Sequence, residues 1–330
     1  MSTLNPVAER RSTEDEHFLE RAPETPFQTF ARHFRRDRLA LGGAVVLLLL
    51  LLVALTGKAL TEVGHNPVID PTTVRLIDKF RPPMARASGR LPDEHLPVLG
   101  IYLLGTDELG RDVFARMLQG SFVSLSIGFV AVAISLTVGI TLGGLAGFYG
   151  GLRIGPVSVD VLVMRFTDIM LCFPTFFLIL TVVVLLPASI YNIMIVIGLT
   201  TWMGTARFVR AEFMSLREQD YVVAATALGL PDWRIIFVHM VPNAMAPVLV
   251  SATINVATAI LTESALSFLG FGVQPPFATW GNILSDGKGY IFDAPWLFFI
   301  PGFAILVVVL AFNLVGEGMR EANNPKLSRR

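Results

Sequence analysis

The stretch Tyr221–Asn243, YVVAATALGLPDWRIIFVHMVPN, decides how this chain folds. It is of mixed polarity and lies between two long apolar runs. An alanine pair, Ala224 and Ala225, is followed by Gly229 and later by Pro242. Small residues, then a glycine and a proline, predict a short helix that connects two membrane spans.

Local signals define the ends of this short helix. We expect it over Tyr221–Leu228, with the Asp220 carboxylate as its N-cap and Gly229 in the left-handed conformation that ends it. A second helix then has an apolar face formed by Trp233, Ile236 and Phe237.

The alanines of the first helix, Ala224, Ala225 and Ala227, leave little side chain, so a partner surface can approach the backbone closely. A helix that merely lies at the membrane surface fits the same residues. Both interpretations stay open at this point.

The composition is that of a membrane protein with several spans. Hydrophobic residues form 53% of the 330 residues and charged residues only 16%, whereas a typical soluble domain carries about 25% charged residues. Lys+Arg and Asp+Glu are equal at 26 each, so the net charge gives no reason to expect a nucleic-acid partner.

The apolar runs set the number of spans, because a helix needs roughly 20 apolar residues to cross a bilayer. We predict an all-α integral membrane protein with six transmembrane helices; five or seven stay open because Pro174 blurs one end. The runs are Leu39–Thr56, Ser121–Tyr149, Ile169–Ala206 (two spans separated at Pro187–Ser189), Met240–Thr262 and Ala294–Gly316.

Basic residues give the expected orientation, because cytoplasmic loops are enriched in lysine and arginine. Arginines crowd the start of the first span, which predicts a cytoplasmic N-terminus; six spans then return the C-terminus to the cytoplasm. The expected organisation is a cytoplasmic tail (1–38), a first span (39–57), an external loop with a lead-in helix capped by Thr106 or Asp107 (58–116), a core with five spans (117–318) and a cytoplasmic tail (319–330).

The opening segment resembles the loop of ABC importer permeases with the pattern Glu-Ala-Ala, three residues, Gly, nine residues, Ile, one residue, Leu-Pro. The alanine pair, Gly229 and Pro242 match that spacing, but Val223 stands at the Glu position. The variant in peptide permeases, Tyr-Val-x-Ala-Ala…Leu-Gly…His-x-x-Pro-Asn, fits better; Thr226 stands where those proteins often have Arg.

Three further blocks strengthen the resemblance. Leu104–Val113, Leu266–Trp280 and Ala294–Glu317 resemble, in order and spacing, segments of the C-type permease subunit of dipeptide, oligopeptide and nickel importers. The resemblance covers roughly residues 30–325.

This resemblance implies a type I ABC importer permease fold, with a coupling helix between helices 4 and 5. It implies a multi-pass subunit in a bacterial inner membrane, partnered by a second homologous permease in a heterodimer, two ATP-binding subunits and an external solute-binding protein. ATP and Mg would be bound by the partner ATPases, and this chain would hold no cofactor. The coupling residues would be Tyr221, Ala224, Ala225, Gly229 and Pro242. The implied substrate is a di- or oligopeptide, with nickel or another small solute as the alternative.

Polar residues inside the spans are candidates for function, because charges in a membrane are costly. They line a path or serve packing: Arg165, Asp168, Asn255 and Glu263. Arg165 and Asp168 are three residues apart, a spacing that lets them pair on one helix face. A stand-alone ion-coupled transporter that uses Asp168 or Glu263 is a second hypothesis.

Glycines recur every four residues in the second apolar run, at Gly139, Gly143, Gly147 and Gly151. Such small residues allow close helix packing in lipid. The packing is either internal or between two permease subunits.

Signatures of catalysis are missing from the sequence. It has no GxxxxGK[ST] phosphate loop, no HExxH and no GxSxG, and its five histidines lack metal-ligand spacing. We therefore expect no enzymatic activity and no metal site in this chain.

Overall fold

The computed structural model describes residues 26–62, 69–89, 96–97 and 99–323. Much of the two predicted tails, 1–38 and 319–330, and part of the loop 58–116 lie outside the described residues.

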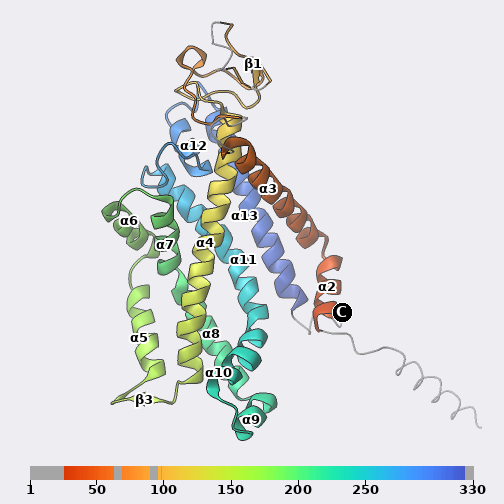
Figure 1. Cartoon of the computed structure of the whole chain (residues 1–330), viewed down its shortest axis with the longest axis vertical. Coiled ribbons are helices and arrows are strands. Elements are labelled where there is room, and N and C mark those ends of the chain that lie inside the picture. The colour runs from red at the N-terminus through yellow and green to blue at the C-terminus, as the bar shows by residue number, and fades with distance from the viewer. Residues whose placement is uncertain (1–25, 63–68, 90–95, 98, 324–330) are drawn as a thin grey trace, which may run out of the picture.

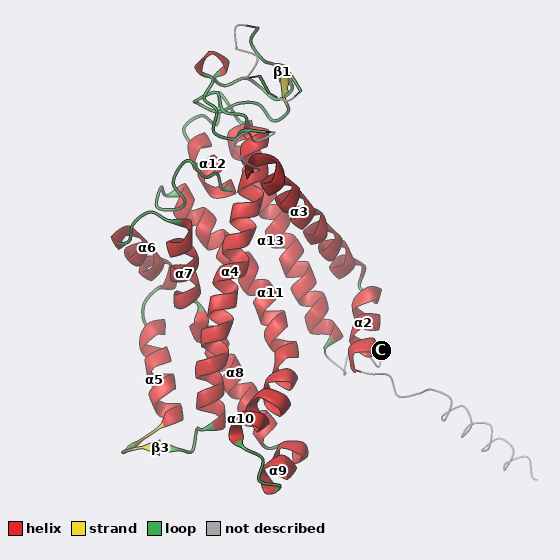
Figure 2. Cartoon of the chain, in the orientation of Figure 1, coloured by secondary structure: helices red, strands yellow, loops and turns green. Residues whose placement is uncertain are grey.

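Helices form nearly all of the regular structure, as expected from the sequence (Figure 2). They are α2 (Pro26–Arg36), α3 (Arg38–Glu62), α4 (Val113–Phe148), α5 (Val159–Leu171), α6 (Thr175–Leu185), α7 (Ile190–Thr200), α8 (Trp202–Arg217), α9 (Asp220–Ala227), α10 (Asp232–Arg234), α11 (Val241–Phe268), α12 (Trp280–Gly287) and α13 (Trp296–Ala322). The short elements are the 3-10 turn η1 (Leu76–Asp78), the π-helical turn η3 (Ile235–Met240) and two antiparallel strand pairs, β1 (Ala85–Arg86) with β2 (Ile101–Tyr102) and β3 (Arg153–Ile154) with β4 (Val157–Ser158).

Four helical segments are long and apolar enough to cross a membrane by themselves: Arg38–Thr61, Val113–Phe148, Asp232–Phe268 and Trp296–Ala322. Two bent pairs pass the same test together, α5 with α6 at 82° and α7 with α8 at 41°. The chain reaches the expected six spans when each bent pair counts as one.

The third span differs from the expected one. It begins with α5 at Val159 instead of at Ile169, and it breaks at Phe173–Pro174. Pro174 cannot donate a backbone hydrogen bond, so a continuous helix is unfavourable there. The charged residues of α5 lower its hydropathy, so the apolar run did not show where the helix begins. Two of them, Asp160 and Asp168, pair with arginines of α8.

The second span also starts earlier than its apolar run. Asp112 caps α4, since its carboxylate accepts a hydrogen bond from the Phe114 backbone at 2.8 Å. The predicted lead-in helix does not form over residues 104–112; Gly105 and Gly110 have positive φ there, and the chain turns instead. Asp107 accepts side-chain ion pairs in place of capping a helix.

Figure 1 shows α4 in the middle of the bundle, with the other long helices around it. Strands β1 and β2 and helix α12 lie at one end, here called the upper end; α9, α10 and β3 lie at the opposite, lower end. The expected glycine ridge packs inside the chain. A Cβ on Gly139 would lie 2.6 Å from the Thr205 Cβ, and one on Gly147 would lie 2.5 Å from the Phe213 Cβ, so α4 and α8 touch closely. Gly151 lies beyond α4 with open space around its Cβ direction and is not part of this contact.

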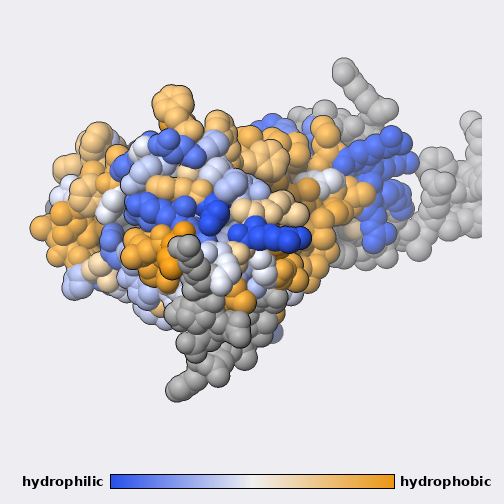
Figure 3. Space-filling view, turned by 90° about the horizontal axis from the view of Figure 1, so that it is seen from above, coloured by the Kyte–Doolittle hydropathy of each residue, from blue (hydrophilic) through white to orange (hydrophobic). Residues whose placement is uncertain are grey.

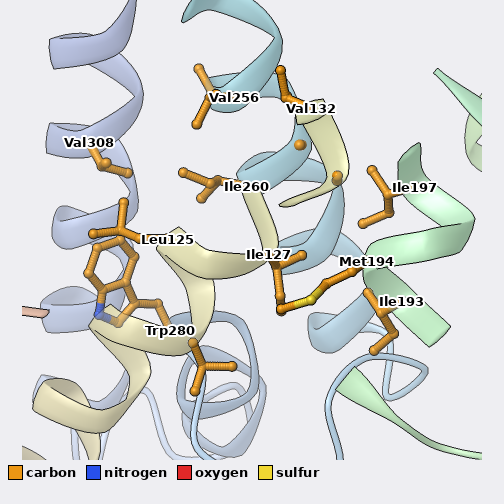
Figure 4. Close-up of a cluster of buried hydrophobic side chains, with 14 of the residues drawn as sticks. Leu125, Ile127, Val132, Ile193, Met194, Ile197, Val256, Ile260, Trp280 and Val308 are labelled. Atoms are coloured by element: carbon orange, nitrogen blue, oxygen red, sulfur yellow. The ribbon is translucent and has the colours of Figure 1, made fainter. Parts of the chain in front are cut away.

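The main core lies between α4, α7, α11, α12 and α13 (Figure 4). Its side chains are aliphatic apart from a few large residues such as Trp280 of α12, and they come from segments far apart in the sequence. A second cluster, at the lower end, joins α8, α9, η3 and α11.

Buried ion pairs hold the upper end together. Asp107 is fully buried and accepts hydrogen bonds from Arg111 and Arg116 at 2.6 Å each. Arg116, in the first turn of α4, also lies 2.9 Å from a carboxylate oxygen of Asp286, which ties α4 to α12. Figure 3, viewed from this end, shows hydrophilic and hydrophobic residues mixed across the surface.

A second buried carboxylate joins several described segments of the upper end. Asp78 accepts a hydrogen bond from the Tyr102 hydroxyl at 2.8 Å and another from the Ser88 backbone at 2.9 Å. Burial, together with this bond to a carboxylate, raises the pKa of the Tyr102 hydroxyl. The carboxylates of Asp78 and Asp107 are thus both bonded within the chain.

Candidate functional site

Helix α9 lies at the lower end, between the end of α8 and the start of α10 (Figure 1). The prediction of Asp220 as its N-cap is wrong. Gln219 occupies the N-cap, and its carbonyl accepts bonds from the Val222 and Val223 backbones at 2.9 and 3.0 Å. Asp220 is the first helical residue, where its negative charge still favours the positive end of the helix.

Gly229 ends α9 as the sequence predicts. It adopts φ of 72°, and it donates a backbone bond to Thr226 at 3.0 Å. The Leu230 backbone donates to the Ala225 carbonyl at 3.2 Å. This pair of bonds is the Schellman motif, which satisfies carbonyls that the helix end would otherwise leave bare.

Helix α9 has one buried and one exposed face. Val222 and Ala225 are buried in the lower cluster. Tyr221, Ala224 and Leu228 face outward, and Leu228 is 82% exposed. The expectation that all three alanines offer a docking surface is therefore corrected: Ala225 packs inward, because residues three apart on a helix, here Val222 and Ala225, share a face.

The segment after α9 adds more exposed apolar area. Trp233 and Phe237, four residues apart, are 62% and 67% exposed, while Ile236 is partly buried against the lower cluster. The exposed residues of this loop, which we together call the lower apolar surface, are Tyr221, Val223, Ala224, Leu228, Trp233 and Phe237. Exposed apolar residues of this kind are candidates for a contact with another protein or with lipid.

A polar contact secures the start of α10. Asp232 accepts a hydrogen bond from the Tyr149 hydroxyl, which follows α4. Partial desolvation and this bond raise the pKa of Tyr149. Nearby, Arg217 donates to the Phe148 carbonyl at 3.2 Å. The loop is therefore tied to the lower end of α4 from both sides.

Pro242 lies in the first turn of α11, with its side chain exposed. In a regular helix its ring would clash with the Val238 carbonyl, four residues earlier. The chain avoids this with the π-helical turn before it, in which Val241 bonds to the Ile236 carbonyl. The proline thus shapes the helix that leads from the loop into the membrane span.

The polar residues predicted inside the spans separate into two places. Asp168 forms an ion pair with Arg207 of α8 at 2.6 Å, not with Arg165 as the spacing suggested. Arg207 reaches the Asp168 carboxylate from the neighbouring helix, because α5 and α8 pack against each other. Asp160 pairs in the same way with Arg210, with one bond of 2.7 Å.

Glu263 and Asn255 lie on α11, away from those pairs. Glu263 is fully buried; its Oε1 accepts a bond from the Ser267 hydroxyl at 2.7 Å. Asn255 is half-buried. Arg165 and Asp168 thus line the same groove between α5 and α8 without bonding to each other, whereas Asn255 and Glu263 lie elsewhere, on α11.

The sequence did not predict two ion pairs, that of Asp160 with Arg210 and that of Asp168 with Arg207. The signal was present, since α5 and α8 carry opposite charges inside segments that are otherwise apolar. Only the packing of α5 against α8 identifies the partners. Among the described residues, no group of three or more His, Cys, Asp or Glu side chains could hold a metal ion.

Comparisons with known proteins agree with this architecture. Residues 139–329 match the family described as the binding-protein-dependent transport system inner membrane component. Residues 25–83 match the N-terminal TM domain of oligopeptide transport permease C.

Two relatives match along most of their length. The dipeptide transport system permease protein DppC of Alkalihalophilus pseudofirmus is 37% identical over 92% of this chain and 91% of that protein. The oligopeptide transport system permease protein OppC of Bacillus subtilis is 35% identical over 90% of this chain and 88% of that protein. A chain of the MetNI methionine ABC transporter, solved in an inward-facing conformation, aligns with a TM-score of 0.51 over 64% of this chain and 97% of its own, at 19% identity, and shares the fold.

The chain belongs to the family of inner-membrane components of binding-protein-dependent transport systems. It is a multi-pass membrane permease subunit with the type I ABC importer fold.

Proposed function

We propose that this chain forms half of the path of an ATP-driven importer and receives its driving motion through α9. The observation that carries the proposal is the lower apolar surface, which lies on a helix whose other face is anchored in the lower cluster. A separate cytoplasmic ATPase subunit covers this surface. ATP and Mg²⁺ are bound and ATP is hydrolysed there, and this chain holds no cofactor.

The anchoring of α9 explains how motion would be transmitted. Val222 and Ala225 pack with Val209 and Phe213 of α8 and with Met240 before α11. An ATPase that moves α9 therefore moves the ends of two spans with it, because a packed core transmits displacement. The close contact of α8 with the glycines of α4 carries the motion into the bundle. Such rigid-body movement is one of the known forms of conformational switching.

The orientation follows from this assignment. The lower end faces the cytoplasm, as do both termini, and the upper end faces an external solute-binding protein. Arginines at the start of α3 and in α8 support this, since basic residues favour the cytoplasmic side. A second, homologous permease completes the path as a heterodimer, and two ATPase subunits bind below.

The substrate we propose is a di- or oligopeptide. The proteins named above are called dipeptide and oligopeptide transport permeases, and they cover almost the whole chain. Nickel or another small solute is the alternative. A stand-alone ion-coupled transporter finds less support, because the similar proteins are permeases of peptide transport systems and the Asp168 carboxylate is paired.

Purification of the complex tests the proposal. The tagged chain should copurify with its ATPase and, in liposomes, take up a labelled dipeptide only with ATP and the binding protein present. Uptake by the lone chain, driven by an ion gradient, would contradict it. Nickel uptake in place of peptide uptake would refute only the substrate.

A further inference from the structure

A groove of about 470 Å³ lies between α5 and α8 and is not used by the coupling surface. Most of its lining groups are charged. It is lined by Asp160, Val161, Met164, Arg165, Asp168, Arg207 and Arg210.

The charges of this groove do not balance. Both carboxylates are engaged by arginines of α8, Asp168 by Arg207 and Asp160 by Arg210. The third guanidinium, that of Arg165, is exposed and has no ion pair or hydrogen bond to another described residue. The groove therefore carries one positive charge more than it has negative charges.

The groove lies on the lower parts of the two bent spans, with α5 on one side and α8 on the other; its Asp160 and Arg210 end lies beside Gly147 and Gly150, at the lower end of α4. Phe166, next to Arg165, stacks on Trp202 of α8 with the ring centres 5.8 Å apart. On its other side α8 packs against Gly143 and Gly147 of α4, which is a single long span. Charged side chains on a membrane span face water or protein and not lipid, because the bilayer interior excludes them.

We propose that this groove binds the carboxylate of the transported peptide on its way through the membrane, with Arg165 as the binding group. The proposal rests on the proposed function, since it assumes a peptide in transit. A guanidinium donates two parallel hydrogen bonds to a carboxylate, which a neutral amide cannot accept with the same strength. The volume lies within the range of about 300–1,000 Å³ that is typical of small-molecule sites.

The two ion pairs limit the number of guanidinium groups that can bind a ligand carboxylate in the groove. They hold Arg207 and Arg210 away from the ligand, so that a single free guanidinium acts, and Val161 and Met164 offer apolar contact to a side chain. Because the groove is open, water screens the contact. We expect removal of the Arg165 charge to slow transport about three- to tenfold, the size of effect that a partly exposed charged contact supports.

The test uses the complete transporter in liposomes, with its ATPases and with the binding protein saturated. It compares the maximal uptake of a dipeptide with that of its C-terminal amide, for the unaltered protein, Arg165→Gln, Arg165→Lys and the control Arg153→Gln. Arg153 is an exposed arginine of β3 outside the groove. Saturation removes the affinity of the binding protein from the comparison.

The expected result is a three- to tenfold loss for the dipeptide in Arg165→Gln, partial recovery in Arg165→Lys, and no change for the amide or in Arg153→Gln. Equal losses for both peptides, or no loss, would overturn the proposal. So would a loss that follows the content of anionic lipid for both peptides, because lipid phosphate would then be the ligand.

If the amide is not taken up at all, the lysine variant decides. Recovery of dipeptide uptake in Arg165→Lys supports the site, and a loss equal to that of Arg165→Gln refutes it. Failure of the unaltered protein to take up any dipeptide would instead refute the proposed function, so the two failures are distinguishable.

Discussion

The two ends of the molecule satisfy their side chains in opposite ways. At the upper end, Asp107 and Asp78 are fully buried and each is bonded within the chain. At the lower end, Leu228, which follows α9, is 82% exposed, while Val222 of α9 is buried. Buried charges hold the upper end together, whereas α9 at the lower end combines a buried apolar face with an exposed apolar one.

This difference separates residues that act through stability from residues that act through a partner. A change in a buried, paired group leaves a charge without compensation and weakens the fold. A change in an exposed apolar group leaves the fold intact and weakens association. The following predictions use this distinction.

The largest effect is expected at the upper end. Asp107→Ala should destabilise the protein by about 3–5 kcal/mol, because Arg116 is left buried with only the more exposed Asp286 as partner. Thermal unfolding of the purified permease measures this. The neighbouring Glu108→Ala is the control, since it lies outside the Asp107 network, and it should cost far less; an equal loss for both would show that the network is not responsible.

The lower apolar surface should respond through binding. Leu228→Asp should reduce copurification of the ATPase at least tenfold, since a charge at the centre of an apolar contact costs about 2 kcal/mol or more. Stability should stay unchanged. Leu99→Asp, at a leucine of the upper end that is also exposed, should leave the ATPase bound; loss in both variants would mean that exposure and not position decides.

The two faces of α9 can be compared with one substitution. Ala225→Leu should destabilise the protein by about 1–3 kcal/mol through overpacking of the lower cluster. Ala224→Leu, on the exposed face, should leave thermal stability unchanged and impair coupling of ATP hydrolysis to uptake. Unfolding and uptake assays on both variants test the assignment, which fails if the two alanines exchange roles.

The smallest effect concerns the end of α9. Gly229→Val should lower the free energy of unfolding by about 1–2 kcal/mol. A branched residue is strained at a φ of 72°, although the space around this position is open. Hydrolysis should continue while uptake falls. The variant Gly229→Asn should retain most of the uptake, because asparagine adopts this backbone conformation more easily than valine. Normal uptake by the valine variant would argue against a role for the rigid helix end.

Much of the fold was accessible from local signals. The apolar runs predicted the spans, and Gly229 predicted the end of α9, because both depend on neighbours along the chain. The start of α5 and the cap at Asp112 were missed. In both places charged residues that hydropathy assigns to a loop belong to a helix or its cap, since other segments compensate their charge or bury it.

The candidate site divides along the same line. The spacing of Ala224, Gly229 and Pro242 predicted a coupling role for the loop, which stays a prediction, and it could not say that Ala225 faces inward. The sequence marked Arg165 and Asp168 as polar residues in a span, yet it paired them with each other.

The sequence by itself determined that this is a helical membrane protein. It also determined where a short helix connects the fourth and fifth spans and which residue ends that helix. Those features follow from hydrophobic length and from backbone preferences of single residues. The tertiary structure alone decided which face of α9 is free and which arginine each aspartate of α5 meets. Burial and ion pairing depend on groups that are distant in sequence, and only the packing of α5, α8 and α9 brings them together.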